Sequence, residues 1–453
     1  MKMPENPPEL AKLSGPEIKQ LLSPDPGSVN ELSALAKKAN EEYLYWDTFK
    51  YLKIPPAISK ELAWAYLKLT RNSQIRKTPL KDIKNSPFGY WLPEGVLKIL
   101  HEIDQNAGGQ ILVDDPRIRL SEKERYLVSS IMEEAIASSQ IEGAATTRKK
   151  AKEMLKLGKK PTNTAEQMIL NNYLTIKNIK KYIDKPLSKE LIIEIQASIT
   201  KDTLEDKTAV GRFKKEGDGD YEVVDRADGA TLFQPPPISE IEERIKTLCD
   251  YANEDQGETF VHPVVKAIAL HFGLAYIHPF VDGNGRTARA LFYWYMLKSK
   301  YWLFEYLSIS RILIRAPGQY KRAYLYSEID GQDLTYFLMF NLRAVNLAIR
   351  GLHAYLTKQQ QELAETTPLI RKYPDLNHRQ QDLLFHAVSD SAAIYTIKFQ
   401  KNVHNVSYET ARADLLELEK RGFLTRIQKK GKEFAYVPSK DISKKLKGQK
   451  AGL

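Results

Sequence analysis

The chain has 453 residues, of which 42% are apolar and 28% are charged, and its formal net charge is +11. This balance is typical of an ordinary soluble globular protein with room for two to four domains. A single cysteine, Cys249, excludes an intrachain disulfide framework and a cysteine-based zinc site, and no apolar run is long enough to cross a bilayer.

The positive charge is concentrated near the end of the chain. Residues 371–453 contain 17 Lys and Arg against 9 Asp and Glu, which is +8 of the total +11. Such an asymmetry indicates an appended module with an acidic partner, for which DNA is a candidate. The first ten residues have no apolar run, so we expect no secretory signal, and a cytoplasmic location.

The first part of the chain, residues 1–114, is predicted to be a helical N-terminal region. Apolar residues recur at helical spacing in 31–52 and 58–74, while 86–106 begins as an aromatic loop and continues as a helix. We expect the aromatic side chains to pack in the core. The region also offers room for a homodimer interface, although the sequence does not specify one.

A long helix is predicted for about residues 121–143. Ser138 and Glu142 are four positions apart, so helical geometry places them on the same face. Gly143 suits the end of this helix because glycine readily adopts the left-handed conformation that follows a helix.

Residues 211–237 change the pattern. Short β-prone runs, YEVV and ATLF, alternate with Gly-Asp turn signals, and three prolines close the segment. The pattern predicts a β-hairpin. His262-Pro263 then begins another helix, with proline at its first position.

The string from His278 to Arg289, HPFVDGNGRTAR, carries the densest chemistry in the chain. A Gly-Asn-Gly turn that opens a helix presents backbone N–H groups at the positive end of the helix dipole, which favours phosphate binding. Arg286 and Arg289 are three residues apart and can reach the same anion with their planar forks.

Two further residues complete this predicted site. Asp282 directly precedes this Gly-Asn-Gly turn, the anion cradle at residues 283–285. A carboxylate there can hold a Mg²⁺ ion that bridges phosphates. His278 can take a proton from an incoming hydroxyl. Together these parts predict phosphoryl or nucleotidyl transfer, a reaction that depends on positioning and charge stabilisation. Phe280 has no chemistry and should anchor the loop in the core.

Other features of the sequence favour structural roles. His101, His262 and His271 lack neighbouring carboxylates at metal-ligand spacing, so we assign them to helix caps and the core. The chain also lacks the GxxxxGK[ST] string, which excludes a P-loop enzyme.

The C-terminal part is predicted to be a winged helix-turn-helix over residues 370–438, followed by a basic tail at 439–453. Three helical stretches precede a hairpin with Lys-Lys-Gly-Lys at its tip, and Ser407 should cap the third helix. That helix carries several acidic residues, so dimerisation or target recruitment competes with DNA binding as the role of the module.

The string at 278–289 resembles the Fic family signature, HPFx[D/E]GNGRxxR, with every specified position filled. The resemblance covers about residues 115–350 and implies a mainly α fold, with a Fic domain at 115–357 and a flap at 211–237. It implies transfer of AMP from ATP to a Tyr, Thr or Ser hydroxyl of a target protein or of the chain itself.

The resemblance also implies individual roles within the signature. His278 would be the general base and Asp282 the Mg²⁺ ligand, and the phosphates would be bound by Gly283, Asn284, Gly285, Arg286 and Arg289. Tyr320 is a candidate for the nucleoside pocket, although a second tyrosine expected beside it is absent.

Upstream, Ser138 to Gly143 resembles the family's inhibitory motif, [S/T]xxxE[G/N]. By that resemblance Glu142 would pair with Arg289 and deny it to the γ-phosphate of ATP. The alternatives left open are a DNA-binding regulator with a Fic sensor core, an enzyme that mainly removes AMP, and transfer of another phosphate-containing group.

Overall fold

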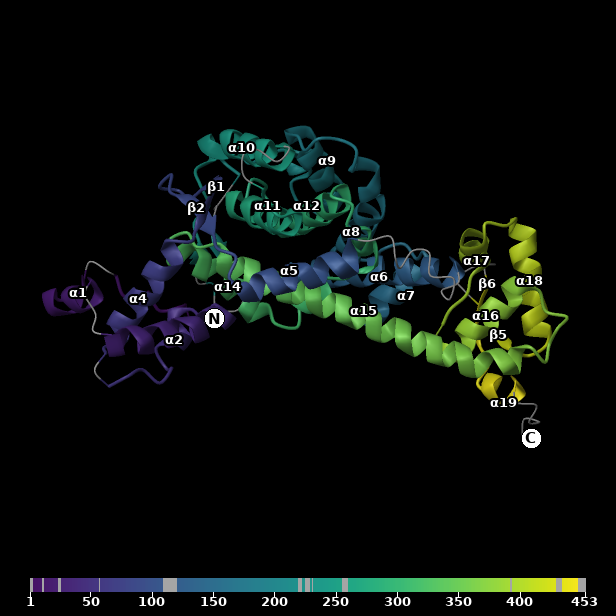
Figure 1. The fold of residues 1–453 in the computed structure, drawn as a ribbon. Helices are drawn as coiled ribbons and strands as arrows, with labels where there is room; N and C mark the ends of the chain where they lie inside the picture. Colours follow the sequence, from purple (N-terminus) through teal and green to yellow (C-terminus); the bar gives the residue numbers. More distant parts are fainter. Residues whose placement is uncertain are drawn as a thin grey trace. The chain divides into compact units, whose positions relative to one another are not determined.

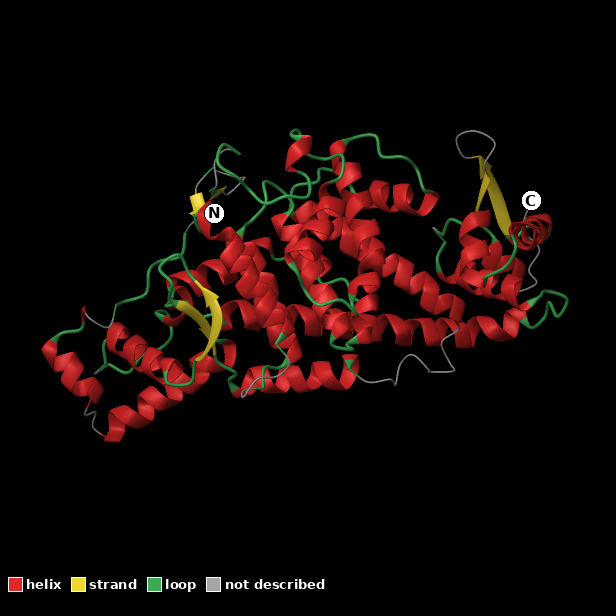
Figure 2. Ribbon diagram, turned by 90° about the horizontal axis from the view of Figure 1, so that it is seen from above, coloured by secondary structure: helices red, strands yellow, loops and turns green. Residues whose placement is uncertain are grey.

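The computed structural model describes residues 3–9, 12–22, 26–56, 58–108, 120–218, 222–224, 229, 231–254, 260–391, 393–428 and 434–446. The fold is mainly helical, as predicted, and the strands of the described residues form three separate antiparallel pairs (Figures 1 and 2). No helix in these ranges is both long and apolar enough to cross a membrane.

The chain divides into two compact units. Unit 1 contains residues 1–109, 134–145 and 163–348, and unit 2 contains 110–133, 146–162 and 349–453. Two long helices, α6 (Leu120–Ile141) and α15 (Thr335–Ile370), contribute to both units. The N-terminal helices therefore group with the centre of the chain, while the boundaries at 114 and 357 stay predictions.

The N-terminal part of unit 1 is helical but also contains a hairpin. Its elements are α1 (Gly15–Leu22), α2 (Pro26–Glu42), α3 (Trp46–Phe49), α4 (Lys60–Asn72), β1 (Arg76–Lys81), β2 (Pro87–Tyr90) and α5 (Glu94–Ala107). The β1–β2 pair corrects the expectation of helices joined by an aromatic loop. Only Thr78 and Leu80 of β1 face the core, and Pro79 separates them, so the strand lacks a clear apolar signal.

A buried ionic cluster joins these helices to the later part of unit 1. Lys68 donates to Asp330 at 2.9 Å, and Tyr43 donates to Asp333 at 2.7 Å. The guanidinium of Arg71 lies 3.9 Å from the centre of the Tyr43 ring and is completely buried. Buried charges are tolerated only when they are paired in this way.

Two helices form the centre of unit 1, α11 (Pro263–Ile277) and α12 (Asn284–Lys298), which pack against each other. Nearly all of their side chains are buried, as expected for helices that are apolar on every face. Around them lie α8 (Thr164–Asn178), η2 (Ile179–Tyr182), α9 (Lys189–Thr200), η3 (Lys207–Ala209), η4 (Ile238–Glu240), α10 (Ile241–Asn253), η5 (Trp302–Tyr306), α13 (Ser310–Leu313) and α14 (Pro317–Ile329).

The histidines assigned to structural roles are placed by the same elements. His262 caps α11, where its Nδ1 accepts from the N–H of Val264 at 3.3 Å. His271 is buried in α11. His101 differs from the expectation, because it lies exposed on α5.

The predicted hairpin at 211–237 is present in part. Strands β3 (Val223–Val224) and β4 (Thr231–Phe233) pair antiparallel, and residues 219–221, 225–228 and 230 lie outside the described residues. The ring of Phe233 packs on Tyr276 of α11, with 4.8 Å between their centres, so β4 lies close to the end of that helix.

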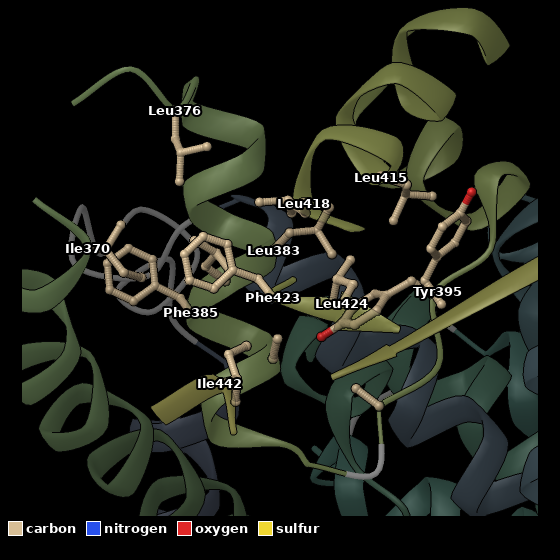
Figure 3. Close-up of a cluster of buried hydrophobic side chains, with 14 of the residues drawn as sticks. Ile370, Leu376, Leu383, Phe385, Tyr395, Leu415, Leu418, Phe423, Leu424 and Ile442 are labelled. Carbon is tan, nitrogen blue, oxygen red and sulfur yellow. The ribbon is translucent and has the colours of Figure 1, made fainter. Parts of the chain in front are cut away.

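The C-terminal part of unit 2 consists of α16 (His378–Ser389), α17 (Ile397–His404), α18 (Tyr408–Lys420), β5 (Leu424–Gln428), β6 (Phe434–Pro438) and α19 (Ile442–Leu446), while α7 (Arg148–Leu157) also belongs to this unit. Ser407 caps α18 as predicted. The helices and the strand pair enclose one apolar core around Leu383, Leu415 and Phe423 (Figure 3).

Three helices are thus followed by an antiparallel pair of strands, which is the predicted order of elements, while the winged helix-turn-helix assignment stays a prediction. The Lys-rich tip, residues 429–433, and residues 447–453 of the tail lie outside the described residues. The sequence missed α19, which falls inside the segment expected to be a basic tail. Ile442 and Leu446 of α19 are buried against the module, although four lysines lie between and beside them in sequence.

Candidate active site

His278 stands directly after the last turn of α11. Its backbone adopts the left-handed conformation, with φ 51° and ψ 51°, and its N–H donates to the carbonyl of Leu274 at 3.1 Å. The ring Nδ1 lies 3.3 Å from the carbonyl oxygen of Ala275. Because a carbonyl only accepts, Nδ1 carries the proton and Nε2 the lone pair.

The ring of His278 is neutral at physiological pH. Burial lowers its pKa to about 4, and the positive charge of Lys214 acts in the same direction. A neutral imidazole with its lone pair on Nε2 has the form needed by a general base.

Asn284 holds the loop that follows His278. Its Oδ1 accepts from the N–H of Phe280 at 2.9 Å, and its Nδ2 donates to the carbonyl of the same residue at 2.7 Å. The Phe280 ring is completely buried and packs against Phe213. Phe280 therefore anchors the loop, as expected. The Asn284 side chain is occupied by the loop backbone, so only its main chain remains to face a phosphate.

Two glycines shape the start of α12. Gly283 has φ +84°, and an added Cβ would lie 2.8 Å from Cγ2 of Thr200. At Gly285 an added Cβ would lie 2.1 Å from Oε1 of Glu142. The Glu142 carboxylate is thus in direct contact with the N-terminus of α12, the position that favours an anion.

Arg286 is fully buried beneath this turn. Its Nη2 donates to Oδ2 of Asp282 at 2.9 Å, and its Nη1 to the carbonyl of Ile199 at 3.4 Å. Its Nε has no partner within the part of the chain that the structure describes. Burial lowers its pKa, although Asp282 opposes that effect. A buried guanidinium with one unpaired N–H group can still donate a hydrogen bond to an anionic ligand.

Arg289 is held by the helix that precedes it in the chain by about 150 residues. Its Nε donates to Oγ of Ser138 at 2.9 Å, and its Nη2 donates to the carbonyl of Ser138 at 3.0 Å and to Oε1 of Glu142 at 2.8 Å. Burial opposes the charge of Arg289, but the adjacent Glu142 carboxylate raises its pKa above the ordinary value. Arg289 therefore stays charged and paired.

The end of α6 fixes the position of Glu142. The N–H of Ala144 donates to the carbonyl of Ser139 at 2.9 Å, and that of Gly143 to Gln140 at 3.0 Å. With φ +92° at Gly143, this is a Schellman motif. Glu142 is the last residue before the left-handed glycine, so its side chain is held against α12.

A buried carboxylate, Glu134, fastens α6 two turns earlier. It accepts from the hydroxyl of Tyr293 at 2.8 Å and the N–H of Ser310 at 2.9 Å, and also from the hydroxyls of Ser308 and Ser310. Sequence reasoning missed this role. The one signal in the sequence was the position of Glu134, which shares a helical stripe with the apolar Leu127 and Ile131. A carboxylate that is buried on such a stripe needs several hydrogen-bond donors.

The start of the flap segment at 211–237 is bonded to the loop that follows His278. Gln196 accepts from the N–H of Gly211 at 2.8 Å and donates to the carbonyl of Asp282 at 3.1 Å. The N–H of Lys214 donates to the carbonyl of Pro279 at 2.8 Å. Sequence reasoning missed Gln196 and Lys214, which carry no motif and are brought to the loop only by the fold.

Tyr320 lies in α14, buried beside His271. Its hydroxyl is 2.8 Å from Nε2 of His271 and 3.3 Å from the hydroxyl of Tyr324. These contacts occupy its polar end within the core, so a role for Tyr320 in a nucleoside pocket stays a prediction.

Asp282 is the one carboxylate of the string at 278–289, and its side chain is 43% exposed. The described residues contain no cluster of three or more His, Cys, Asp or Glu that could hold a metal by themselves. Mg²⁺ is commonly held by one or two carboxylates together with phosphates and water. The partly exposed Asp282 carboxylate beside the anion cradle fits such a shared site.

The comparisons with known proteins agree with this site. The Fic/DOC family model matches residues 186–296, which include His278 and the start of α12. The match does not include residues 138–143.

Curated relatives match over short stretches. The chain is 37% identical over 67 residues to protein adenylyltransferase fic-1 of Caenorhabditis elegans, covering 15% of this chain and 13% of that protein. It is 28% identical over 122 residues to protein adenylyltransferase Fic of Nematostella vectensis, covering 27% and 26%. The matched stretch thus spans about a quarter or less of each relative.

A solved structure is similar over a larger part of the chain. A Fic family protein from Desulfovibrio desulfuricans has a TM-score of 0.49 and 18% identity, covering 77% of this chain and 97% of that one.

Proposed function

Starting from the Fic domain at residues 186–296, we propose that this chain is a protein adenylyltransferase that is held inactive by Glu142. The observation that carries the proposal is the pairing at Arg289, which lies one turn after the anion cradle on α12 and is bound by Glu142 at 2.8 Å. A carboxylate and a phosphate cannot both occupy one side of a guanidinium.

The proposed reaction transfers AMP from ATP to a hydroxyl of a Tyr, Thr or Ser side chain, on a target protein or on the chain itself. The hydroxyl oxygen forms a bond to the α-phosphorus while the bond to the pyrophosphate oxygen breaks, and Nε2 of His278 takes the hydroxyl proton. Arg286, Arg289 and the backbone N–H groups at Gly283–Gly285 bind the phosphate charges that leave as pyrophosphate. Asp282 would hold a Mg²⁺ ion, which supplies charge neutralisation of the phosphates when bound.

The flap would present the target hydroxyl. Strand β4 would pair with an extended target segment through backbone hydrogen bonds, a mode that requires little side-chain selectivity. The contact of Phe233 in β4 with Tyr276 supports this role. Tyr276 is only two residues before His278 in the chain, so the contact places β4 beside the segment that carries the proposed base.

The test uses ATP labelled at either its α- or its γ-phosphate, incubated with Mg²⁺, a lysate and the Glu142→Gly variant. AMP transfer leaves the α-label on protein and the γ-label in solution. The added substitution His278→Ala should abolish labelling. Protein labelled from γ-ATP would instead show transfer of another phosphate-containing group, and no protein label in either arm would reject the transferase.

A second activity, removal of AMP, is supported by one observation. The Glu142 side chain is 25% exposed and touches the anion cradle at Gly285, where a carboxylate could orient a water molecule. Incubation of the wild-type chain with a protein it has modified, while free AMP is followed, distinguishes this activity. Release that persists in Glu142→Gly would argue against this role for Glu142.

We also propose DNA as a partner of the C-terminal module. The acidic residues of α18 are paired within the module: Asp414 with Arg379 at 2.6 Å, Glu417 with Arg421 at 2.7 Å and Glu419 with Arg426 at 3.0 Å. These pairs reduce the repulsion from phosphate that the sequence of α18 suggests. A titration against duplex DNA at two salt concentrations tests the role, and binding without salt dependence, or no binding, would favour recruitment or dimerisation.

A further inference from the structure

A cavity of about 460 Å³ lies in unit 1 beside the C-terminal end of α11. Its walls come from the β1–β2 hairpin, α10 and α11, which lie together in Figure 1. The buried lining is apolar and consists of Leu80, Phe88, Phe272, Tyr276 and Ile277. The exposed lining is mostly polar and includes Lys81, Asn85 and Glu243. An apolar floor with a few polar groups at the rim is typical of binding pockets of this size.

The walls are cross-linked, so the cavity is preformed. Arg244 of α10 donates to the carbonyls of Lys81 and Asp82 at 2.6 and 2.9 Å, and to Glu240 at 2.8 Å. The hydroxyl of Tyr276 accepts from the N–H of Ile83 at 3.1 Å, which joins α11 to the same hairpin. A pocket held open in this way loses little free energy to ordering when a ligand binds.

The cavity lies close to the proposed base. Tyr276 and Ile277 line it and directly precede His278 in the chain. Gly273, also in the lining, is five residues before His278, which is about 7.5 Å along a helix axis. The flap strand β4 contacts Tyr276 through Phe233, and residues 234–239 lead from β4 to Glu240 in the cavity wall.

We propose that this cavity binds one large apolar side chain of the target polypeptide and so selects the protein that is modified. The inference rests on the proposed transferase function. An extended segment rises about 3.3 Å per residue, so a side chain bound about 7.5 Å from the base belongs to a residue about two or three positions from the modified hydroxyl. The anchor and the backbone pairing to β4 would act on the same segment.

The rim adds a charge preference. Glu243 is exposed, and no ion pair to it exists in the part of the chain that the structure describes, whereas Glu240 is engaged by Arg244. Lys81 is exposed at the same rim, so the unpaired Glu243 carboxylate favours Lys or Arg in the target only on the α10 side of the pocket.

The experiment fills the cavity in the Glu142→Gly background. Thr247→Trp places an indole in the cavity from α10, where the Thr247 hydroxyl bonds only to its own helix at Glu243. The matched control is Lys246→Trp, which adds the same side chain at the next, mostly exposed position outside the lining. The probe is a library of 13-residue peptides with a central Thr, Tyr or Ser and random flanks, incubated with α-labelled ATP and Mg²⁺.

The parent and the control should label peptides that are enriched several-fold in Leu, Ile, Met or Phe at one position two or three residues from the hydroxyl. Thr247→Trp should lose that enrichment while its self-labelling and its KM for ATP stay unchanged. Self-labelling without apolar selection, or the same selection in Thr247→Trp, would overturn the pocket assignment and leave the transferase standing. A raised KM for ATP in Thr247→Trp would place the nucleotide there and also overturn it, whereas a parent that labels nothing would defeat the proposed function itself.

Discussion

Arg289 has two competing partners in this account. It is a buried cation on the helix whose N-terminus forms the anion cradle, and it is also bound by Ser138 and Glu142. Because the guanidinium is satisfied in this state, ATP must bind without it or displace Glu142. The inhibition therefore depends on single side chains and needs no distortion of the cradle.

The surroundings of His278 set its pKa, so the pH dependence of the transfer rate can reveal their effect. Burial and the charge of Lys214 lower its pKa to about 4, so the base is neutral above that pH and becomes protonated as the pH falls through it. In a Glu142→Gly background, the rate of AMP transfer should be set by the neutral ring and should decline only near pH 4.

Replacing Lys214 by Met removes a nearby positive charge, so the pKa of His278 should rise and the acid limb of the pH–rate profile should move to higher pH by up to about one unit. Lys215→Met, on the same loop but exposed, is the control and should leave the profile in place. An unshifted acid limb in Lys214→Met would show that its charge does not act on the base.

At the scale of elements, α6 is held in place by several contacts besides the Glu142–Arg289 pair. Glu134 binds α12 and the segment at 308–310, Ala135 accepts from Asn172 at 3.3 Å, and the Schellman motif ends the helix. The structure favours release of the Glu142 side chain with α6 in place, because moving the helix would break all of these bonds.

Glu134→Gln tests this fastening. An amide cannot accept from four donors, so the variant should lose about 2–3 kcal/mol of unfolding free energy, and its basal AMP transfer should rise because Glu142 is held less firmly. Denaturant unfolding and α-label incorporation measure the two effects. Glu133→Gln is the control, since Glu133 pairs with Arg148 and Lys152 and not with the site. Loss of stability without any rise in transfer would mean that Glu134 does not support the inhibited state.

The sequence predicted well what lies close together in the chain. His278 to Arg289 are twelve consecutive residues, so a turn and one helix start were enough to bring them together. Sequence reasoning did not show that the Asn284 amide holds the loop backbone, because side-chain amides suit phosphate or backbone equally well. The pairing of Glu142 with Arg289 spans 147 positions and could be expected only through the family resemblance.

Elements without a clear period were harder to predict. The β1–β2 hairpin was missed because Pro79 and lysines interrupt its alternation, and α19 was missed because lysines surround its two buried apolar residues. Gln196 and Lys214 donate hydrogen bonds to the loop at 278–283. They lie far from this loop in the sequence and reach it only through packing, which no local pattern encodes.

At the scale of the whole molecule, the N-terminal helices are part of the same compact unit as residues 186–296, the stretch that the Fic/DOC family model matches. Asp333 accepts from Tyr43 and lies 3.7 Å from Lys68, and its exposed fraction is zero. The region before residue 109 is thus joined to the unit by buried charges, so its removal would leave charges without partners.

Asp333→Asn should lower the unfolding free energy by about 3–5 kcal/mol, because it leaves the positive charges of Lys68 and Arg71 with one fewer partner in a buried place. Thermal unfolding followed by circular dichroism measures the change. Glu61→Gln, on the exposed face of α4, should change the free energy of unfolding by only about a few tenths of a kcal/mol. If Asp333→Asn unfolds only the first 72 residues and leaves the Fic domain intact, the N-terminal region is an independent domain.

The most direct test of the central claim is the rate of AMP transfer from α-labelled ATP in the wild type and in Glu142→Gly, measured side by side under single-turnover conditions. Loss of a charge-assisted hydrogen bond of about 1.5–3 kcal/mol should raise the rate about 10- to 100-fold. The added substitution Arg289→Ala should cancel the gain, since Glu142 acts through that guanidinium. A wild type as fast as Glu142→Gly, or a gain that survives Arg289→Ala, would contradict inhibition through this pair.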